Sequence, residues 1–179
     1  MVAMGPSGDV IDTYLSAGVQ QMDRRTFDDD LPDQVAVLRS AGVLNPAGQT
    51  TSVLRRDQPF TIEVAVSVRR PAPGLNVAIS VESLRGVRTL DESLFDHDPT
   101  SLEQPGDHVV RLTVPPVLNS GDYVVNLWLG TDYEDLGWFE RALSFHLEGV
   151  TAGRADRVLR LDLPWQVTRA PGTSPVEAG

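Results

Sequence analysis

The stretch that decides the fold of this chain is Pro115–Gly130, which reads PPVLNSGDYVVNLWLG. Two prolines end one extended segment, a turn of small polar residues with a glycine follows, and Tyr123 then opens a new strand. After Tyr123, every second side chain is apolar, which is the period of a strand with one buried face. A turn, a tyrosine and a strand in this order predict an all-β sandwich.

The same alternation recurs on both sides of this stretch. Further short strands are predicted over residues 34–43, 60–68, 75–82, 87–94, 109–114 and 141–148. Turns rich in Gly and Pro separate them, and no long segment has the period of a helix. The sequence therefore predicts an immunoglobulin-like antiparallel β-sandwich.

Three zones are expected along the chain. Residues 1–33 are predicted to hold a short helix, capped by Asp9 and ended by Gly18, and then a charged linker. Residues 34–170 form the sandwich and include a late apolar strand, Val158–Trp165, while residues 171–179 are an expected disordered tail. Because the late strand follows a linker around Gly153, it can pair with its own sheet or be exchanged with a second copy in a homodimer.

Composition limits the partners and the chemistry that can be expected of this chain. The chain has 179 residues, a formal net charge of −10 and a pI near 4.6, which disfavours nucleic acid as a partner. There is no cysteine, so disulfides and thiolate chemistry are excluded. No apolar run approaches the roughly 20 residues that span a bilayer, and no signal peptide is visible.

No catalytic set stands out in the sequence. There is no nucleophile elbow, phosphate-binding glycine loop or zinc-binding His-Glu-x-x-His motif. His97 has no second histidine at ligand spacing. The carboxylates of Asp132, Glu134 and Asp135 form either a solvated acidic loop or a contact for sugar hydroxyls or calcium. We therefore expect no enzyme activity, no cofactor and no metal, with a glycosidase kept as the enzymatic alternative.

Strand alternation assigns the faces of the predicted sheet. Tyr123, Val125, Leu127 and Leu129 share the core face, so the side chains between them point outward. In an immunoglobulin-like topology this strand neighbours the last one and the strand near residue 76. One exposed face would then carry six candidate carbohydrate-binding residues: Asn76, Ser80, Asn126, Trp128, Ser144 and His146.

An outward tryptophan among amides and hydroxyls suits a sugar-binding surface. The indole of Trp128 can stack on the apolar face of a pyranose while planar polar groups meet its hydroxyls. The alternative is that the N-terminal segment, the late strand or a dimer partner covers Trp128. Tyr133, Trp138 and Phe139 either line the edge of the same surface or close the hairpin that holds them.

Several stretches resemble the C-terminal domain of Wzt-type proteins, the ATP-binding subunits of ABC transporters that export O-antigen polysaccharides. Gln58–Val64 is similar to the strand opening of that family, Val117–Tyr123 to its Gly-x-Tyr turn, and Gly153–Trp165 to its closing segment. Gly8–Leu15 resembles the last helix of the ATPase domain that precedes it. The phosphate loop of that ATPase is not in this sequence.

The resemblance implies a non-catalytic domain that binds the non-reducing, often chemically capped end of a polysaccharide and so licenses its export. It also implies a homodimer that exchanges its last strand, and a cytoplasmic position at the inner face of the membrane, where the parent protein meets the transmembrane permease. The alternative function is a structural dimerisation domain that does not bind glycan.

Overall fold

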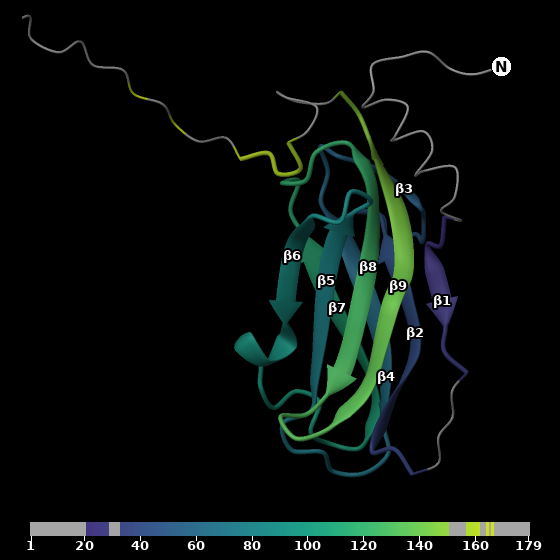
Figure 1. Ribbon diagram of the computed structural model, residues 1–179. Coiled ribbons are helices and arrows are strands. Elements are labelled where there is room, and N and C mark those ends of the chain that lie inside the picture. The colour runs from purple at the N-terminus through teal and green to yellow at the C-terminus, as the bar shows by residue number, and fades with distance from the viewer. Residues whose placement is uncertain (1–20, 29–32, 151–156, 162–163, 165, 167–179) are drawn as a thin grey trace, which may run out of the picture.

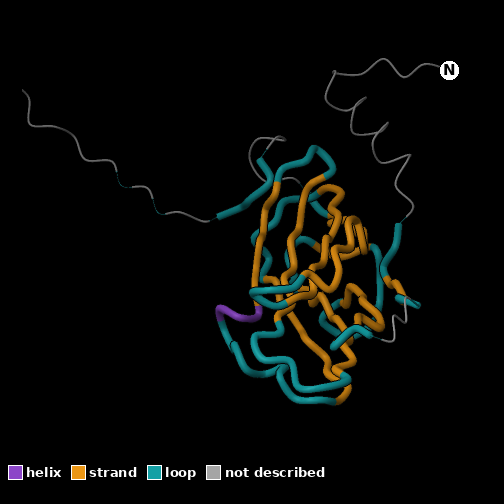
Figure 2. The backbone as a smooth tube through the Cα atoms, turned by 60° about the horizontal axis from the view of Figure 1, so that its bottom comes forward, coloured by secondary structure: helices purple, strands orange, loops and turns teal. Residues whose placement is uncertain are grey.

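Two β-sheets packed face to face make up the described part of the chain (Figure 1). The computed structural model describes residues 21–28, 33–150, 157–161, 164 and 166. Within this part of the chain the backbone consists of strands and loops, and its helical element is the short 3-10 turn η1 (Leu94–Asp96), as Figure 2 shows. The predicted all-β sandwich is therefore confirmed.

The first sheet has four antiparallel strands in the order β1-β2-β4-β7. Its strands are β1 (Arg24–Thr26), β2 (Ala36–Leu44), β4 (Phe60–Val68) and β7 (Gly106–Val114). The second sheet has five strands in the order β3-β9-β8-β5-β6. Its strands are β3 (Val53–Arg55), β5 (Asn76–Ser83), β6 (Arg88–Ser93), β8 (Gly121–Gly130) and β9 (Asp135–Glu148).

One pairing departs from the antiparallel prediction. The short strand β3 runs parallel to β9, with Val53 opposite His146. Before β3 the chain folds back on β2, where Thr50 bridges Leu44, and it then crosses to the edge of the other sheet. This crossing brings β3 to the edge of β9 in the same direction as β9, so the sandwich is not wholly antiparallel.

The core lies between the sheets, where the alternating side chains meet. In β4 every second residue from Phe60 to Val68 is buried, and the residues between them are partly exposed. On the facing sheet Tyr123, Val125, Leu127 and Leu129 are buried, as the alternation predicted. The rings of Phe60 and Phe145 meet across the core at 4.9 Å.

The turn before β8 is held by a tyrosine corner. The hydroxyl of Tyr123 donates a 2.9 Å hydrogen bond to the carbonyl of Asn119, four residues upstream, as in immunoglobulin-type sandwiches. The side chain of Asn119 in turn donates to the carbonyl of Arg157 at 2.8 Å. Because this motif belongs to the turn and the start of β8, the Pro115–Gly130 stretch predicts the fold.

The late strand appears in the described residues as a single bridge. Leu159 pairs with Leu118, so residues 157–161 lie against the loop before β8 of their own chain. The rest of the predicted strand at 162, 163 and 165 lies outside the described residues, as do the predicted N-terminal helix and the tail at 171–179. Exchange of this strand between two copies stays a prediction.

The N-terminal boundary of the sandwich differs from the expected one. Residues 24–26 of the expected linker form strand β1, and Phe27 is buried with its ring 4.7 Å from that of Phe139. Charged residues surround these few apolar positions, so the local composition resembles a linker. The last strand is also longer than predicted, since β9 begins at Asp135 and not at Arg141.

Candidate functional site

All six predicted site residues lie on β5, β8 and β9, which are adjacent in the five-stranded sheet. The register places Asn126 opposite Ser80, and Val124 opposite Ser144. The predicted neighbourhood of these strands is therefore correct. The predicted exposure is correct for only some of the side chains.

Ser80 and Asn126 are buried, which contradicts the exposure predicted for them. The amide of Asn126 donates to the hydroxyl of Ser80 at 3.2 Å and accepts the backbone N–H of Arg141 at 2.8 Å. The register of β8 against β9 shifts at this point, and Arg141 has a positive φ of 47°. Asn126 thus stabilises a β-bulge, and its polar groups are used within the protein.

Ser144 is also buried, against the prediction. Its hydroxyl accepts the backbone N–H of Met22 at 2.8 Å, and its own N–H donates to the carbonyl of Met22 at 2.9 Å. The segment that precedes β1 therefore runs beside β9. Alternation along one strand assigns a face, but it contains no information about a distant segment that packs there.

Asn76 and His146 are partly exposed but already bonded. The amide of Asn76 donates to the hydroxyl of Ser93 at 2.8 Å and accepts the backbone N–H of Phe95 at 3.0 Å. The Nδ1 atom of His146 lies 2.9 Å from a carboxylate oxygen of Asp122. Asn76 thereby positions the η1 turn, and His146 is oriented by its acidic neighbour.

Two tryptophans stand side by side on the outer face of this sheet. The register places Trp128 of β8 directly opposite Trp138 of β9. Trp138 is 56% exposed, whereas Trp128 is half-buried and donates its indole N–H to the carboxylate of Asp135 at 2.8 Å. We call Trp128, Trp138 and Asp135 the tryptophan patch.

A glycine makes room for the Trp128 ring. A Cβ atom built on Gly130 would lie 2.4 Å from Cζ2 of Trp128 and 2.7 Å from the carbonyl oxygen of Glu134. Real Cβ atoms do not approach other atoms so closely, so the ring lies over the bare backbone of Gly130. The hydrogen bond to Asp135 and the missing side chain together fix the indole in one orientation.

From the sequence, Trp138 either lines the edge of the sugar-binding surface or closes its hairpin, and Asp135 is predicted to lie in a loop. Both residues belong to β9, and they lie on the tryptophan patch. The missed signal is the alternation of the exposed Trp138 and Glu140 with the partly buried Phe139, which continues the last strand toward its N-terminal end. The glycine at 137 concealed it, because glycine inside a strand weakens the pattern.

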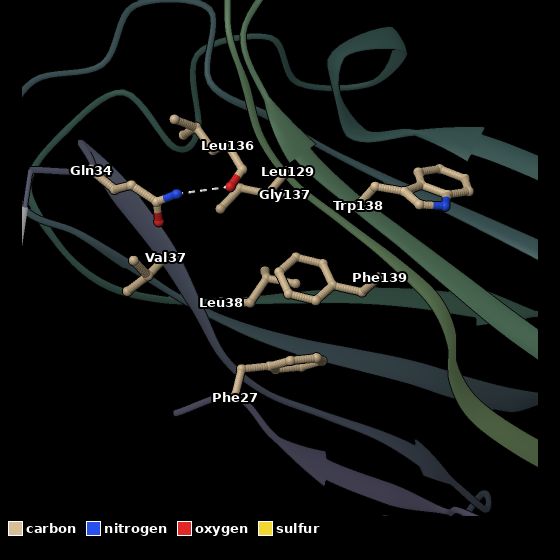
Figure 3. A pocket seen from close by; sticks show the side chains of 9 residues that line it. All are labelled: Phe27, Gln34, Val37, Leu38, Leu129, Leu136, Gly137, Trp138 and Phe139. Carbon is tan, nitrogen blue, oxygen red and sulfur yellow. Dashed lines mark hydrogen bonds between the residues drawn. The ribbon is translucent and has the colours of Figure 1, made fainter. Parts of the chain in front are cut away.

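A cavity of about 350 Å³ opens beside the patch, between β2 of one sheet and β9 of the other. Figure 3 shows the rings of Phe27 and Phe139 facing it, while the indole of Trp138 points away. The side chain of Gln34 donates to the carbonyl of Leu136 at 3.0 Å and supplies the polar part of a mostly apolar lining. Such a lining suits core packing better than a hydroxylated ligand.

Across the described residues, no three His, Asp or Glu side chains are arranged to hold a metal ion. That part of the chain likewise contains no helix long and apolar enough to cross a membrane. The histidine closest to an acidic group is His146, whose ring meets one carboxylate.

These observations define a β-sandwich with an aromatic surface patch. The sequence profile of the Wzt C-terminal domain matches residues 33–156, so the chain belongs to this family. The family is a non-catalytic region of the ATPase subunit of O-antigen ABC transporters. No curated protein sequence matches the chain.

A solved structure similar to this chain has the same fold. The crystal structure of the C-terminal domain of Wzt aligns with a TM-score of 0.64 at 14% identity, covering 88% of this chain and 96% of that one. The CARDB domain of a Pyrococcus furiosus protein, solved with two metal ions, has a TM-score of 0.38 at 15% identity, covering 69% and 96%. A β-glucosidase from Listeria innocua, solved with glucose, has a TM-score of 0.38 at 9% identity, covering 74% and 22%.

Proposed function

We propose that this domain binds the non-reducing, often capped end of an O-antigen-type polysaccharide and thereby licenses its export by an ABC transporter. The observation that carries the proposal is the tryptophan patch, in which an exposed indole stands beside a second indole and a carboxylate. The indole of Trp138 offers a flat apolar surface to the C–H face of a sugar. One oxygen of Asp135 accepts the indole N–H of Trp128, which leaves its other oxygen to accept a sugar hydroxyl.

The charge of the chain fits a neutral glycan. With a net charge of −10 the protein repels polyanions, whereas neutral sugars are unaffected. One or two stacked rings with a few hydrogen bonds, offset by desolvation, give affinities in roughly the micromolar to millimolar range. Of the six residues first predicted, Trp128 and His146 remain candidates for contact, and Asn76, Ser80, Asn126 and Ser144 support the sheet.

The parent protein supplies the cellular setting of this proposal. As part of a transporter ATPase, the domain would lie in the cytoplasm at the inner face of the membrane, beside the transmembrane permease. Family membership supports this placement. A homodimer would present two copies of the patch, each able to bind the end of one polysaccharide chain.

The test is a titration of this chain with polysaccharide purified from the source organism, followed by tryptophan fluorescence. We expect saturable quenching. Trp138→Ala should lower the affinity obtained from the titration at least tenfold. Val109→Ala, which removes an exposed apolar side chain from β7 of the other sheet, is the matched control and should bind normally. No response of the unchanged protein at millimolar glycan would favour the structural dimerisation domain.

A further inference from the structure

A second cleft lies among the loops at the end of the sandwich where β8 stops. It has a volume of about 370 Å³, and its walls come from the loops around residues 73, 99 and 132 together with η1. The residues that give it chemical character are Phe95, Pro99, Thr100, Glu103, Asp132 and Tyr133. The cleft shares no residue with the tryptophan patch.

Two aromatic rings stand open to solvent at the cleft. Tyr133 is 98% exposed and Phe95 is 40% exposed. Single exposed apolar side chains are common, whereas apolar side chains that gather at a cleft mark a contact with a ligand or partner. Neither ring contributes to the core of the sandwich, so folding alone does not explain why they are aromatic.

The walls of the cleft are held by hydrogen bonds. The carboxylate of Glu103 accepts the backbone N–H of Gly74 at 3.2 Å, and the carbonyl of Glu103 accepts that of Ala72 at 3.0 Å. On the opposite wall, the Thr131 hydroxyl accepts the N–H groups of Tyr133 and Glu134 at 3.3 and 3.1 Å. These hydrogen bonds fix the backbone of the loops, which lowers the cost of ordering them on binding.

The composition of the walls selects the chemistry of the ligand. No Lys or Arg lines the cleft, and the carboxylates of Glu103 and Asp132 make it negative, so an anionic group is disfavoured. Aromatic faces combined with carboxylate and hydroxyl oxygens suit a neutral sugar, which has both an apolar face and hydroxyl donors.

The cleft also borders the face that carries the tryptophan patch. Trp128 lies opposite Ala78, and two residues further along β8 Gly130 lies opposite Asn76. The amide of Asn76 holds the backbone N–H of Phe95 at the cleft. A glycan on the tryptophan patch can therefore continue over Asn76 toward Phe95 and Tyr133.

We infer that this loop cleft is a second sugar subsite, which binds a neutral residue further along the polysaccharide whose end occupies the tryptophan patch. The inference rests on the proposed function. Its consequence is that the domain recognises chain length as well as the chain end, since short glycans cannot reach both positions.

The test measures binding of the full chain to two probes. These are the polysaccharide purified from the source organism and its shortest fragments that retain the non-reducing end, made by mild acid hydrolysis. Tyr133→Ala and Phe95→Ala should each raise the Kd for the long glycan about three- to tenfold. The Kd for the short fragments should stay within about twofold of that of the unchanged protein. Tyr133→Phe, which keeps the ring, should bind like the unchanged protein.

Two controls separate this inference from the proposed function. Trp138→Ala should weaken both probes, and Val87→Ala, an exposed apolar residue before β6, should weaken neither. Thermal melts should be unchanged for Tyr133→Ala, because this side chain is fully solvated.

Four results would overturn the subsite. If Tyr133→Ala and Phe95→Ala leave the long glycan unaffected while Trp138→Ala weakens it, the patch stands and the subsite is wrong. Equal weakening of both probes would make the cleft part of the end-binding site. Binding of a Lys-rich peptide that Tyr133→Ala abolishes, with glycan binding unchanged, would assign the cleft to a basic protein segment. Failure of the unchanged protein to bind either glycan would refute both proposals.

Discussion

Tyr123 shows how one side chain connects the turn before β8 with the core. Burial raises the pKa of its phenol to about 12, from an ordinary value of 10.0. Above pH 10 the unfolded chain therefore loses a proton that the folded chain retains. The contribution of the protonated Tyr123 phenol to the free energy of unfolding is complete below pH 10 and falls as the pH rises toward 12.

For Tyr123→Phe we expect a loss of about 1 kcal/mol in the free energy of unfolding at pH 7, because the hydrogen bond to Asn119 disappears. We also expect the variant to lose less stability than the unchanged protein between pH 10 and pH 12. Urea unfolding at several pH values measures both effects. Tyr133→Phe is the control, and an identical pH dependence in Tyr123→Phe would show that Tyr123 is not the group responsible.

Gly130 is the residue on which the orientation of Trp128 depends. Because a Cβ at this position would overlap the Trp128 ring, Gly130→Ala should cost about 1–3 kcal/mol and displace the indole from Asp135. Urea unfolding and the near-ultraviolet circular dichroism of the tryptophans measure the two effects.

The matched control is Gly42→Ala in β2, where the nearest atom to an added Cβ would be the Asp23 carbonyl oxygen at 3.6 Å. This is an ordinary contact, so little change is expected. If Gly130→Ala were no more destabilising than Gly42→Ala, the close packing of Trp128 on the backbone would be disproved.

Among the elements, β1 is the strand whose role local composition conceals. It is three residues long, but it places Phe27 in the core, where the ring contacts Phe139 and the guanidinium of Arg25 stacks at 4.9 Å. Phe27→Ala should therefore cost roughly 3–5 kcal/mol, measured by urea unfolding.

Met22→Ala is the comparison variant for Phe27→Ala. The described hydrogen bonds of Met22 join its backbone to Ser144, so the substitution leaves them in place. We expect this variant to lose far less stability than Phe27→Ala. Similar small losses in both variants would mean that the segment before β2 is a peripheral addition and not part of the sandwich.

At the scale of the whole molecule, the late segment bears on the oligomeric state. Residues 157–161 touch the loop before β8, and Leu161 stays 54% exposed. If this segment completes the sheet of a second copy, deleting residues 155–179 should convert a dimer to a monomer in analytical ultracentrifugation. Deleting only residues 171–179 should leave the dimer intact. A dimer that survives the longer deletion would rule out strand exchange.

The sequence alone determined the class of fold and the central strands of the sandwich. The inward faces of β4 and β8 follow from alternation, because the period of two residues is a local property of the strand. The tyrosine corner is likewise encoded within the few residues from Asn119 to Tyr123. The adjacency of β5, β8 and β9 followed from the sandwich topology that these strands imply.

Only the tertiary structure decided which outward side chains remain available. Ser144 bonds to Met22, which is 122 residues away, and Asn126 serves a bulge that forms only when β8 meets Arg141. The patch likewise depends on the register that sets Trp138 opposite Trp128. Burial of an outward residue depends on distant segments of the chain, and a local pattern carries no information about them.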